Sequence, residues 1–371
     1  MRSILLAVTS VVALAATAPA AEWTATIPVE LEWDSTYETD AGDGYSDLYA
    51  TIEPDITVTF SDFWSLGVGL TLEPVTDVLT GEDRFLSDHG LYVRDLFLQL
   101  NFDHSTWRIG KFTPRFSVAY DEAPGVYNDT FNADIELGER FGVEAAVPLS
   151  DGETNQITLT GAVFFRDTTF LSDSALTARG DLDYTDGGPG NTEALENLSV
   201  AVDVANAFGT EGLNLHGAIL HQAAGFLDAD DQFAFVIAGT YAREYESGFG
   251  FSTIAEWAHS EDAWGFGDAA GFSGGSQEVV TVGLGLSQGP WNGAVTWSWR
   301  DNDFGFGAFD ENALQFSAGY TFDFGLDVAI AHQSYDDEFG FEEETFGIYL
   351  GYAIVLADAH HDHSSHDGHD H

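Results

Sequence analysis

The chain has 371 residues, of which 62 are acidic and 11 are basic, so its formal net charge is -51, and it contains no cysteine. These features exclude nucleic-acid binding, which needs a basic face, as well as disulfide scaffolds and cysteine-based catalysis or metal binding. With 44% hydrophobic and 14% aromatic residues and 40 glycines, the chain is too apolar for a disordered acidic protein, and its bias favours strands and turns.

Residues 1–20 have the pattern of a secretory signal peptide. Arg2 precedes an apolar stretch from Ile4 to Ala16, and Ala18-Pro19-Ala20 fits a cleavage site of small residues. The apolar stretch is shorter than the roughly 20 residues that a spanning helix needs, and no later run is longer. The mature chain is therefore expected to begin near residue 21, and to be either an exported soluble protein or a β-barrel.

Alternation of large apolar side chains with polar or small ones predicts strands along the rest of the chain. In one example, Leu66, Val68 and Leu70 alternate with Gly67 and Gly69. Sixteen such segments, of about 10 to 13 residues each, suit tilted strands that cross a bilayer. They are expected near residues 22–38, 45–60, 63–73, 90–102, 105–113, 139–149, 155–166, 197–206, 212–222, 232–243, 249–259, 277–287, 290–300, 312–322, 325–335 and 344–356.

The connections between these segments alternate in length. Joins after even-numbered strands are short, whereas those after odd-numbered strands include the long stretches 74–89, 114–138, 167–196 and 260–276. Short turns at one rim and long loops at the other are typical of outer-membrane barrels. The sequence therefore predicts an all-β fold, a transmembrane antiparallel β-barrel of sixteen strands over residues 21–357. A soluble secreted β-protein would bury the same apolar faces, but it has no reason to sort its loops by length.

The mature chain resembles the 16-stranded general diffusion porins of Gram-negative outer membranes. The resemblance rests on the strand number, the alternating loop lengths and the long acidic third loop that follows Trp107-Arg108-Ile109-Gly110-Lys111-Phe112. It implies a third loop folded into the barrel, a homotrimer in contact with membrane lipid and lipopolysaccharide, and passive diffusion of small hydrophilic solutes. The end of the chain departs from the family, because alternation stops at Leu356 and a tail follows the closing strand.

A charged constriction is expected where the third loop faces the wall. Strand alternation points Arg108, Arg140 and Arg166 into the lumen from three consecutive strands. The third loop opposes them with acidic residues, namely Asp121, Glu122, Asp129, Asp134 and Glu136. Charged rings of this kind set the ion preference of a pore. Alternatively, the arginines are ordinary partners of acids in the barrel wall, such as Glu144.

The excess of acids predicts a pore that prefers cations, because a negative lumen concentrates them. The wall acids expected to be responsible are Glu30, Glu32, Asp34, Glu53, Asp55, Glu256 and Asp327. The alternative is that much of the charge lies in the loops, where it solvates the surface and binds divalent cations of the lipopolysaccharide layer.

The last residues, 358–371, form a tail rich in histidine and aspartate that has no pattern of a packed structure. Imidazole and carboxylate groups are ligands for zinc, nickel or copper. The candidate metal ligands are His360, His361, His363, His366, His369 and His371. Metal capture at the inner mouth of the barrel is one interpretation, and a solvated tail that binds metals incidentally is the other.

No enzyme motif accompanies these features. The sequence lacks G-x-S-x-G, H-E-x-x-H, P-loop and dinucleotide-binding patterns. We therefore expect a pore without catalytic residues and with no required cofactor. The alternatives are a substrate-specific porin for sugars or divalent metals and, with less support, a hydrolase built into an outer-membrane barrel.

Overall fold

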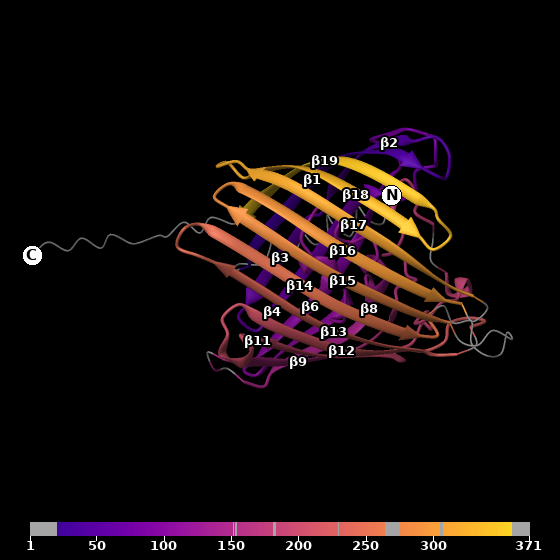
Figure 1. The fold of residues 1–371 in the computed structure, drawn as a ribbon. Helices are drawn as coiled ribbons and strands as arrows, with labels where there is room; N and C mark the ends of the chain where they lie inside the picture. Colours follow the sequence, from indigo (N-terminus) through magenta and orange to yellow (C-terminus); the bar gives the residue numbers. More distant parts are fainter. Residues whose placement is uncertain are drawn as a thin grey trace, which may run out of the picture.

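The computed structural model describes residues 21–357, apart from 151, 153, 181–182, 229, 264–274 and 305–306. The expected signal peptide and the histidine-rich tail lie outside the described residues. The long strands join in a single antiparallel wall, tilted around one axis, that closes on itself (Figure 1). Closure is made by the first strand, β1 (Glu22–Thr39), and the last, β19 (Glu342–Ala357), which pair from Thr24 with Ala357 to Thr39 with Glu343.

Within the described residues the wall has the sixteen strands that the sequence predicts. Besides β1 and β19 they are β2 with β3 (Tyr45–Ile52, Asp55–Ser61), β4 (Trp64–Pro74), β6 (His89–Phe102), β7 (Ser105–Phe112), β8 (Arg140–Pro148), β9 (Gln156–Arg166), β11 (Asn197–Ala205), β12 (Leu213–Gln222), β13 (Gln232–Glu244), β14 (Phe249–Glu261), β15 (Ser276–Gln288), β16 (Trp291–Asp303), β17 (Ala308–Thr321) and β18 (Leu326–Asp337). The two-residue strands β5 (Arg84–Phe85) and β10 (Ala175–Leu176) belong to the long loops.

The second predicted strand is interrupted, because β2 and β3 are separated by Glu53 and Pro54. Proline has no N–H to donate, so the ladder cannot continue through it. The backbone N–H of Glu53 donates to the carbonyl of Pro28 at 3.1 Å, and the carbonyl of Pro54 accepts from Leu70 at 3.0 Å. Both segments pair with β1, so the wall stays continuous across the break.

The outer face of the wall is apolar, and the inner face carries polar and small side chains. On β15, Val282, Leu284 and Leu286 are exposed, whereas Thr281 on the opposite face is buried. No helix among the described residues is long and apolar enough to cross a membrane. An exposed apolar band that encircles a closed sheet is the surface that a lipid environment requires.

The turns and loops sort to opposite rims as predicted. The short connections, such as the one between Ser61 and Trp64, lie at the same rim as the start of β1 and the end of β19. This follows from the pairing of Glu22 with Thr59 and of Thr24 with Ala357. The long connections lie at the other rim. These rims are called the turn rim and the loop rim below.

The apolar core lies inside the barrel, between the wall and loop 3, which is residues 113–139. Loop 3 contains a single helical turn, α2 (Ala119–Glu122), and a short 3-10 helix, η1 (Asn132–Ile135). Its apolar side chains pack against small residues on the inner face of the wall: Phe116, Phe131, Ile135 and Leu137 contact a cluster that includes Ala162, Ala201, Ala218, Ala234 and Ala258. The expectation of a third loop folded into the pore is thus confirmed.

Candidate pore constriction

Loop 3 is anchored to the wall at the start of α2. Glu256 on β14 is buried, and its carboxylate accepts hydrogen bonds from the hydroxyl of Ser117 at 2.6 Å and from the backbone N–H groups of Val118 at 2.8 Å and Ala119 at 3.1 Å. A carboxylate at the first N–H groups of a helical turn satisfies donors that have no partner within the turn. The structure places Glu256, one of the wall acids expected in the lumen, against loop 3, which supplies its partners.

The tip of loop 3, at Pro124, packs directly against two glycines of β15, Gly283 and Gly285. A side chain added at Gly283 on β15 would place its Cβ 2.5 Å from Cδ of Pro124, and one at Gly285 would lie 3.3 Å from Cβ of Pro124. The carbonyl of Pro124 accepts hydrogen bonds from Thr296 on β16 at 2.5 Å and from Gln315 on β17 at 2.8 Å. Glycine is needed at Gly283 because the loop backbone approaches the wall so closely.

The second half of loop 3 crosses to the seam of the barrel. The hydroxyl of Tyr127 donates to Asp34 on β1, and Gly347 on β19 leaves room for the Tyr127 hydroxyl, which would lie 2.0 Å from an added Cβ. Further along, Asn132 accepts from Thr281 on β15 at 2.7 Å. Loop 3 therefore spans the lumen and is held on several strands far apart in sequence.

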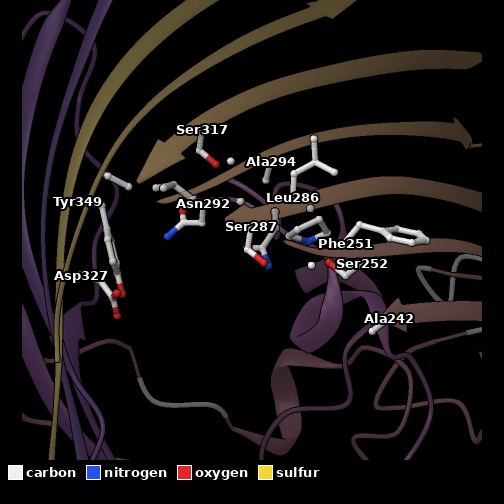
Figure 2. Close-up of a pocket in the computed structure, with 18 of the residues that line it drawn as sticks. Ala242, Phe251, Ser252, Leu286, Ser287, Asn292, Ala294, Ser317, Asp327 and Tyr349 are labelled. Carbon is white, nitrogen blue, oxygen red and sulfur yellow. The ribbon is translucent and has the colours of Figure 1, made fainter. Parts of the chain in front are cut away.

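Cavities remain open beside loop 3. One, of about 840 Å³, lies toward the turn rim and is lined by Glu30, Glu32, Asp327 and Tyr349 together with Pro124 of the loop. Figure 2 shows Asp327 and Tyr349 on one wall of this cavity, across from residues of β14. It is called the turn-side cavity below. Another, of about 800 Å³, separates loop 3 from the inner faces of β3 to β9. It is called the constriction cavity below.

The constriction cavity brings together some of the residues predicted for a charged constriction. Arg108 of the wall and Asp121 and Glu136 of loop 3 line it, as do Glu53 and Asp55. Arg108 lies 3.6 Å from Glu144 on the neighbouring strand and over the ring of Phe97 at 5.2 Å. The ion pair with Glu144 agrees with the alternative that the wall arginines are partners of barrel acids.

The structure places the other predicted constriction residues elsewhere. Arg140 and Arg166 lie at the loop-rim ends of β8 and β9 and line a third cavity, of about 690 Å³, together with Asp134 and Glu136. Asp134 pairs with Arg300 on β16. Glu122 and Asp129 are exposed and line none of these three cavities. Alternation assigns a residue to a face of the wall but not to a height along the strand, so it could not separate Arg108 from the other two arginines.

Sequence reasoning missed Arg94, which forms ion pairs with more carboxylates than the other arginines that line the constriction cavity. Its guanidinium pairs with Glu53 at 2.7 Å, with Asp95 at 2.9 Å and with Asp55. Arg94 and Asp95 are adjacent in sequence yet both line the cavity, because the pairing of β4 with β6 shifts register between Gly69 and Leu70. A bulge brings two successive side chains to one face, and strict alternation cannot show it.

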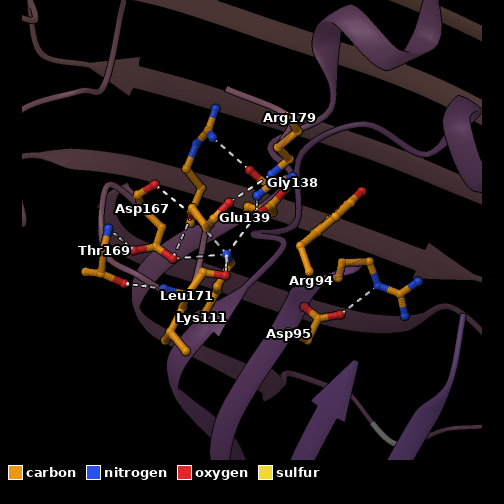
Figure 3. A network of polar contacts seen from close by, with 12 residues as sticks. Arg94, Asp95, Lys111, Gly138, Glu139, Asp167, Thr169, Leu171 and Arg179 are labelled. Carbon is orange, nitrogen blue, oxygen red and sulfur yellow. Dashed lines mark hydrogen bonds and ion pairs between the residues drawn. The ribbon is translucent and has the colours of Figure 1, made fainter. Parts of the chain in front are cut away.

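Arg115 and Lys111 were also outside the predicted site. Arg115 begins loop 3, lines the constriction cavity and pairs with Asp203 on β11 at 2.9 Å. Lys111, the single lysine of the chain, is fully buried and lies 2.7 Å from Glu139 and 3.0 Å from Asp167 (Figure 3). A lone lysine beside the start of a long acidic loop is the signal that could have marked this cluster.

Glu136 provides a titratable charge in the constriction. Burial, with a further contribution from nearby Asp121, raises the pKa of Glu136 to about 7. Glu136 is therefore neutral below that pH and carries a negative charge above it.

Lowering the pH from about 8 to about 6 is expected to weaken cation preference, because Glu136 loses its charge in that interval. The reversal potential of single channels under a salt gradient, followed against pH, should change with a midpoint near 7. The Glu136→Gln variant should lose this step, whereas Glu122→Gln, at an exposed acid on the same loop, should keep it. A step that survives in Glu136→Gln would assign the titration to another group.

Taken together, the closed wall, the apolar outer band and the inward third loop define a 16-stranded outer-membrane β-barrel with the fold of the porins. Solved structures have the same fold. The outer-membrane channel DcaP of Acinetobacter baumannii is 13% identical and superposes with a TM-score of 0.58, over 90% of this chain and 97% of that one. The outer membrane protein OpdK of Pseudomonas aeruginosa gives 9% identity and a TM-score of 0.55, over 90% and 99% of the two chains.

A third similar structure is a loop L8 deletion mutant of OmpT, an outer membrane protein of Vibrio cholerae. It is 11% identical, with a TM-score of 0.52 over 90% of this chain and 99% of that chain. No protein-family model and no curated protein matches the sequence. The similarity therefore concerns the fold, which agrees with the outer-membrane location expected from the sequence.

Proposed function

We propose that this protein is a porin that lets small hydrophilic solutes and ions diffuse through the outer membrane, with a preference for cations. One observation carries the proposal: loop 3 is pinned across the lumen, yet a polar cavity of about 800 Å³ remains open between it and the wall. A narrowed aqueous passage restricts solutes by size and charge and needs no chemical step. The proposal therefore includes no catalytic residue.

The preference for cations rests on the charges around that passage. Three arginines line the constriction cavity, Arg94, Arg108 and Arg115, against nine carboxylates: Glu53, Asp55, Glu73, Asp95, Asp121, Glu136, Glu139, Glu144 and Asp203. Acidic residues also outnumber basic ones in the turn-side cavity, where Glu30, Glu32, Glu244 and Asp327 lie with Arg243. A wall with this balance raises the local concentration of cations and lowers that of anions.

Single-channel recording in planar bilayers under a potassium chloride gradient tests this function. Stable ohmic steps with a reversal potential of the sign set by potassium would support a cation-preferring porin. Ohmic steps with an anion-selective reversal potential would overturn the proposed cation preference but not the proposed porin function. No steps from protein that shows the heat-modifiable migration of a folded barrel would overturn the porin itself.

We also propose that the protein works as a homotrimer embedded in lipid and in contact with lipopolysaccharide. The exposed apolar side chains of the outer band supply a surface for lipid and for neighbouring copies. OmpT of Vibrio cholerae, which is 11% identical, has been solved in a trimer form. The mass of the protein in mild detergent, measured by light scattering, tests the assembly.

The histidine-rich tail supports a second proposal, metal capture beside the pore. The last described residue, Ala357, lies at the turn rim, so the tail begins there. Removing residues 358–371 is expected to abolish high-affinity binding of zinc, nickel or copper, measured by calorimetry on the purified protein, because the candidate imidazole ligands are lost. Metal binding that persists after the deletion would place the ligands in the barrel.

A further inference from the structure

Loop 3 contacts a buried histidine of the wall just before the residues that Glu256 anchors. This histidine, His216, lies on β12, and its side chain is 5% exposed. Its Nε2 lies 2.5 Å from the backbone carbonyl oxygen of Phe116 in loop 3, and its Nδ1 lies 2.9 Å from Oδ1 of Asp203 on β11. The imidazole ring therefore connects the wall to the start of the loop.

Both partners of this ring accept hydrogen bonds and donate none. The carbonyl of Phe116 carries no hydrogen, and Asp203 is ionised because its Oδ1 also accepts from Nη2 of Arg115 at 2.9 Å. A neutral imidazole has one N–H group, so only one of its nitrogens donates, whereas an imidazolium donates from both. The two contacts of His216 therefore form together only when the ring carries two protons.

The charged groups around His216 come from three elements. They are Asp203 on β11, Glu256 on β14 and Arg115 on loop 3, while β13 opposes the ring with Ala238. With a protonated ring, these four side chains carry two positive and two negative charges. A neutral ring leaves an excess of negative charge at a buried place.

Loss of one proton from His216 breaks the contact with loop 3. The remaining N–H stays on the nitrogen that faces Asp203, because a hydrogen bond to a carboxylate is stronger than one to a neutral carbonyl. The lone pair of Nε2 then faces the carbonyl oxygen of Phe116, and the two repel each other. Phe116 is buried, so water cannot readily replace the lost donor.

We propose that His216 is a positioning residue for loop 3, and that its second proton holds the start of the loop against the wall. The proposal rests on the proposed porin function and adds a form of regulation to it. Acidification fixes the loop across the lumen. Deprotonation frees residues 115–117 from β12, which widens the passage beside them.

Single-channel recording against pH tests this role in a Glu136→Gln background, which removes the titration of Glu136 in the constriction. The interval from about pH 5 to about pH 8 is the one in which histidines titrate. Brief larger current steps should become at least about tenfold more frequent as the pH rises, because a hydrogen bond from a charged donor is lost. His216→Gln should show frequent larger steps at every pH, since an amide does not titrate.

His221→Gln is the matched control. His221 lies on the same strand, its side chain is 43% exposed, and it pairs with Asp231 at 3.2 Å instead of with loop 3. This variant should keep the pH dependence of the current steps. A pH dependence that survives in folded His216→Gln, or that disappears in His221→Gln, would overturn the role of His216.

Nitrogen NMR of histidine-labelled protein measures the protonation directly and needs neither open channels nor a variant. One histidine with slow hydrogen exchange should carry protons on both ring nitrogens at low pH, and should lose one over the interval in which the larger steps appear. Slow exchange identifies His216, because its side chain is 5% exposed, whereas those of His221, His259 and His332 are at least 21% exposed. A slowly exchanging ring with one proton throughout would overturn the proposal. The porin function is unaffected by that result and fails only if open channels are absent.

Discussion

Replacing Glu256 with alanine is expected to release loop 3 and raise the single-channel conductance. The change leaves the hydroxyl of Ser117 and the backbone N–H groups of Val118 and Ala119 without their shared acceptor. Losing these bonds to a buried carboxylate costs about 2.8 kcal/mol or more, which shifts the equilibrium between the pinned and the released loop by at least about 100-fold. Larger and noisier current steps in planar bilayers are the expected result.

Glu261→Ala is the control for this prediction. Glu261 belongs to the same strand, and its side chain is 69% exposed at the loop rim, so its loss removes one acid without freeing loop 3. The conductance of this variant should stay close to that of the unaltered protein. If Glu256→Ala behaves in the same way, loop 3 is held by its other contacts and Glu256 is not its main anchor.

Replacing Gly283 with valine is expected to have the opposite effect and lower the conductance. The new Cβ would lie 2.5 Å from Cδ of Pro124 and 3.0 Å from Cγ2 of Ile254, so the tip of loop 3 must move away from β15. Glu256 still holds α2 in this variant, and the displaced tip therefore enters the passage. The measurement is the step size in potassium chloride, compared with the exclusion of neutral solutes of increasing size.

Gly161→Val on β9 provides the comparison, because an added Cβ at Gly161 meets no atom within 4 Å. It imposes the same change of residue type on a strand position that does not touch loop 3. An unchanged conductance is expected there. A wider pore in Gly283→Val would mean that the tip of loop 3 moves out of the lumen. That result would contradict the expectation that the displaced tip enters the passage.

The fold was predictable because its main signal is local. Each wall strand carries its own alternation, as in Leu66, Val68 and Leu70, and each connection carries its own length, so the strand number and the two rims follow without any knowledge of distant contacts. Even the break at Pro54 has a local cause, since proline cannot donate to the ladder.

The candidate site was predictable only in part, because it depends on contacts between residues far apart in sequence. Glu256 accepts a hydrogen bond from Ser117, and Gly283 packs against Pro124, because loop 3 passes through the lumen. No sequence pattern in loop 3 or in the wall strands indicates these contacts. Arg94 escaped prediction because a register shift turns it inward beside Asp95. Arg140 and Arg166 were placed on the correct face, but their separation from Arg108 depends on height along the strands.

The seam between β1 and β19 has a consequence for how the barrel assembles. These strands pair from Thr24 with Ala357 to Thr39 with Glu343, so one edge of the first strand to be made has no partner until the last strand is complete. The other pairings of the wall, including those of β1 with β2 and β3, join strands that are neighbours in sequence and carry a small cost in loop-closure entropy. Until closure, β1 presents a long edge of unpaired backbone groups, and such an edge is a template for aggregation. The seam edge of β1 therefore stays exposed for as long as the barrel is open.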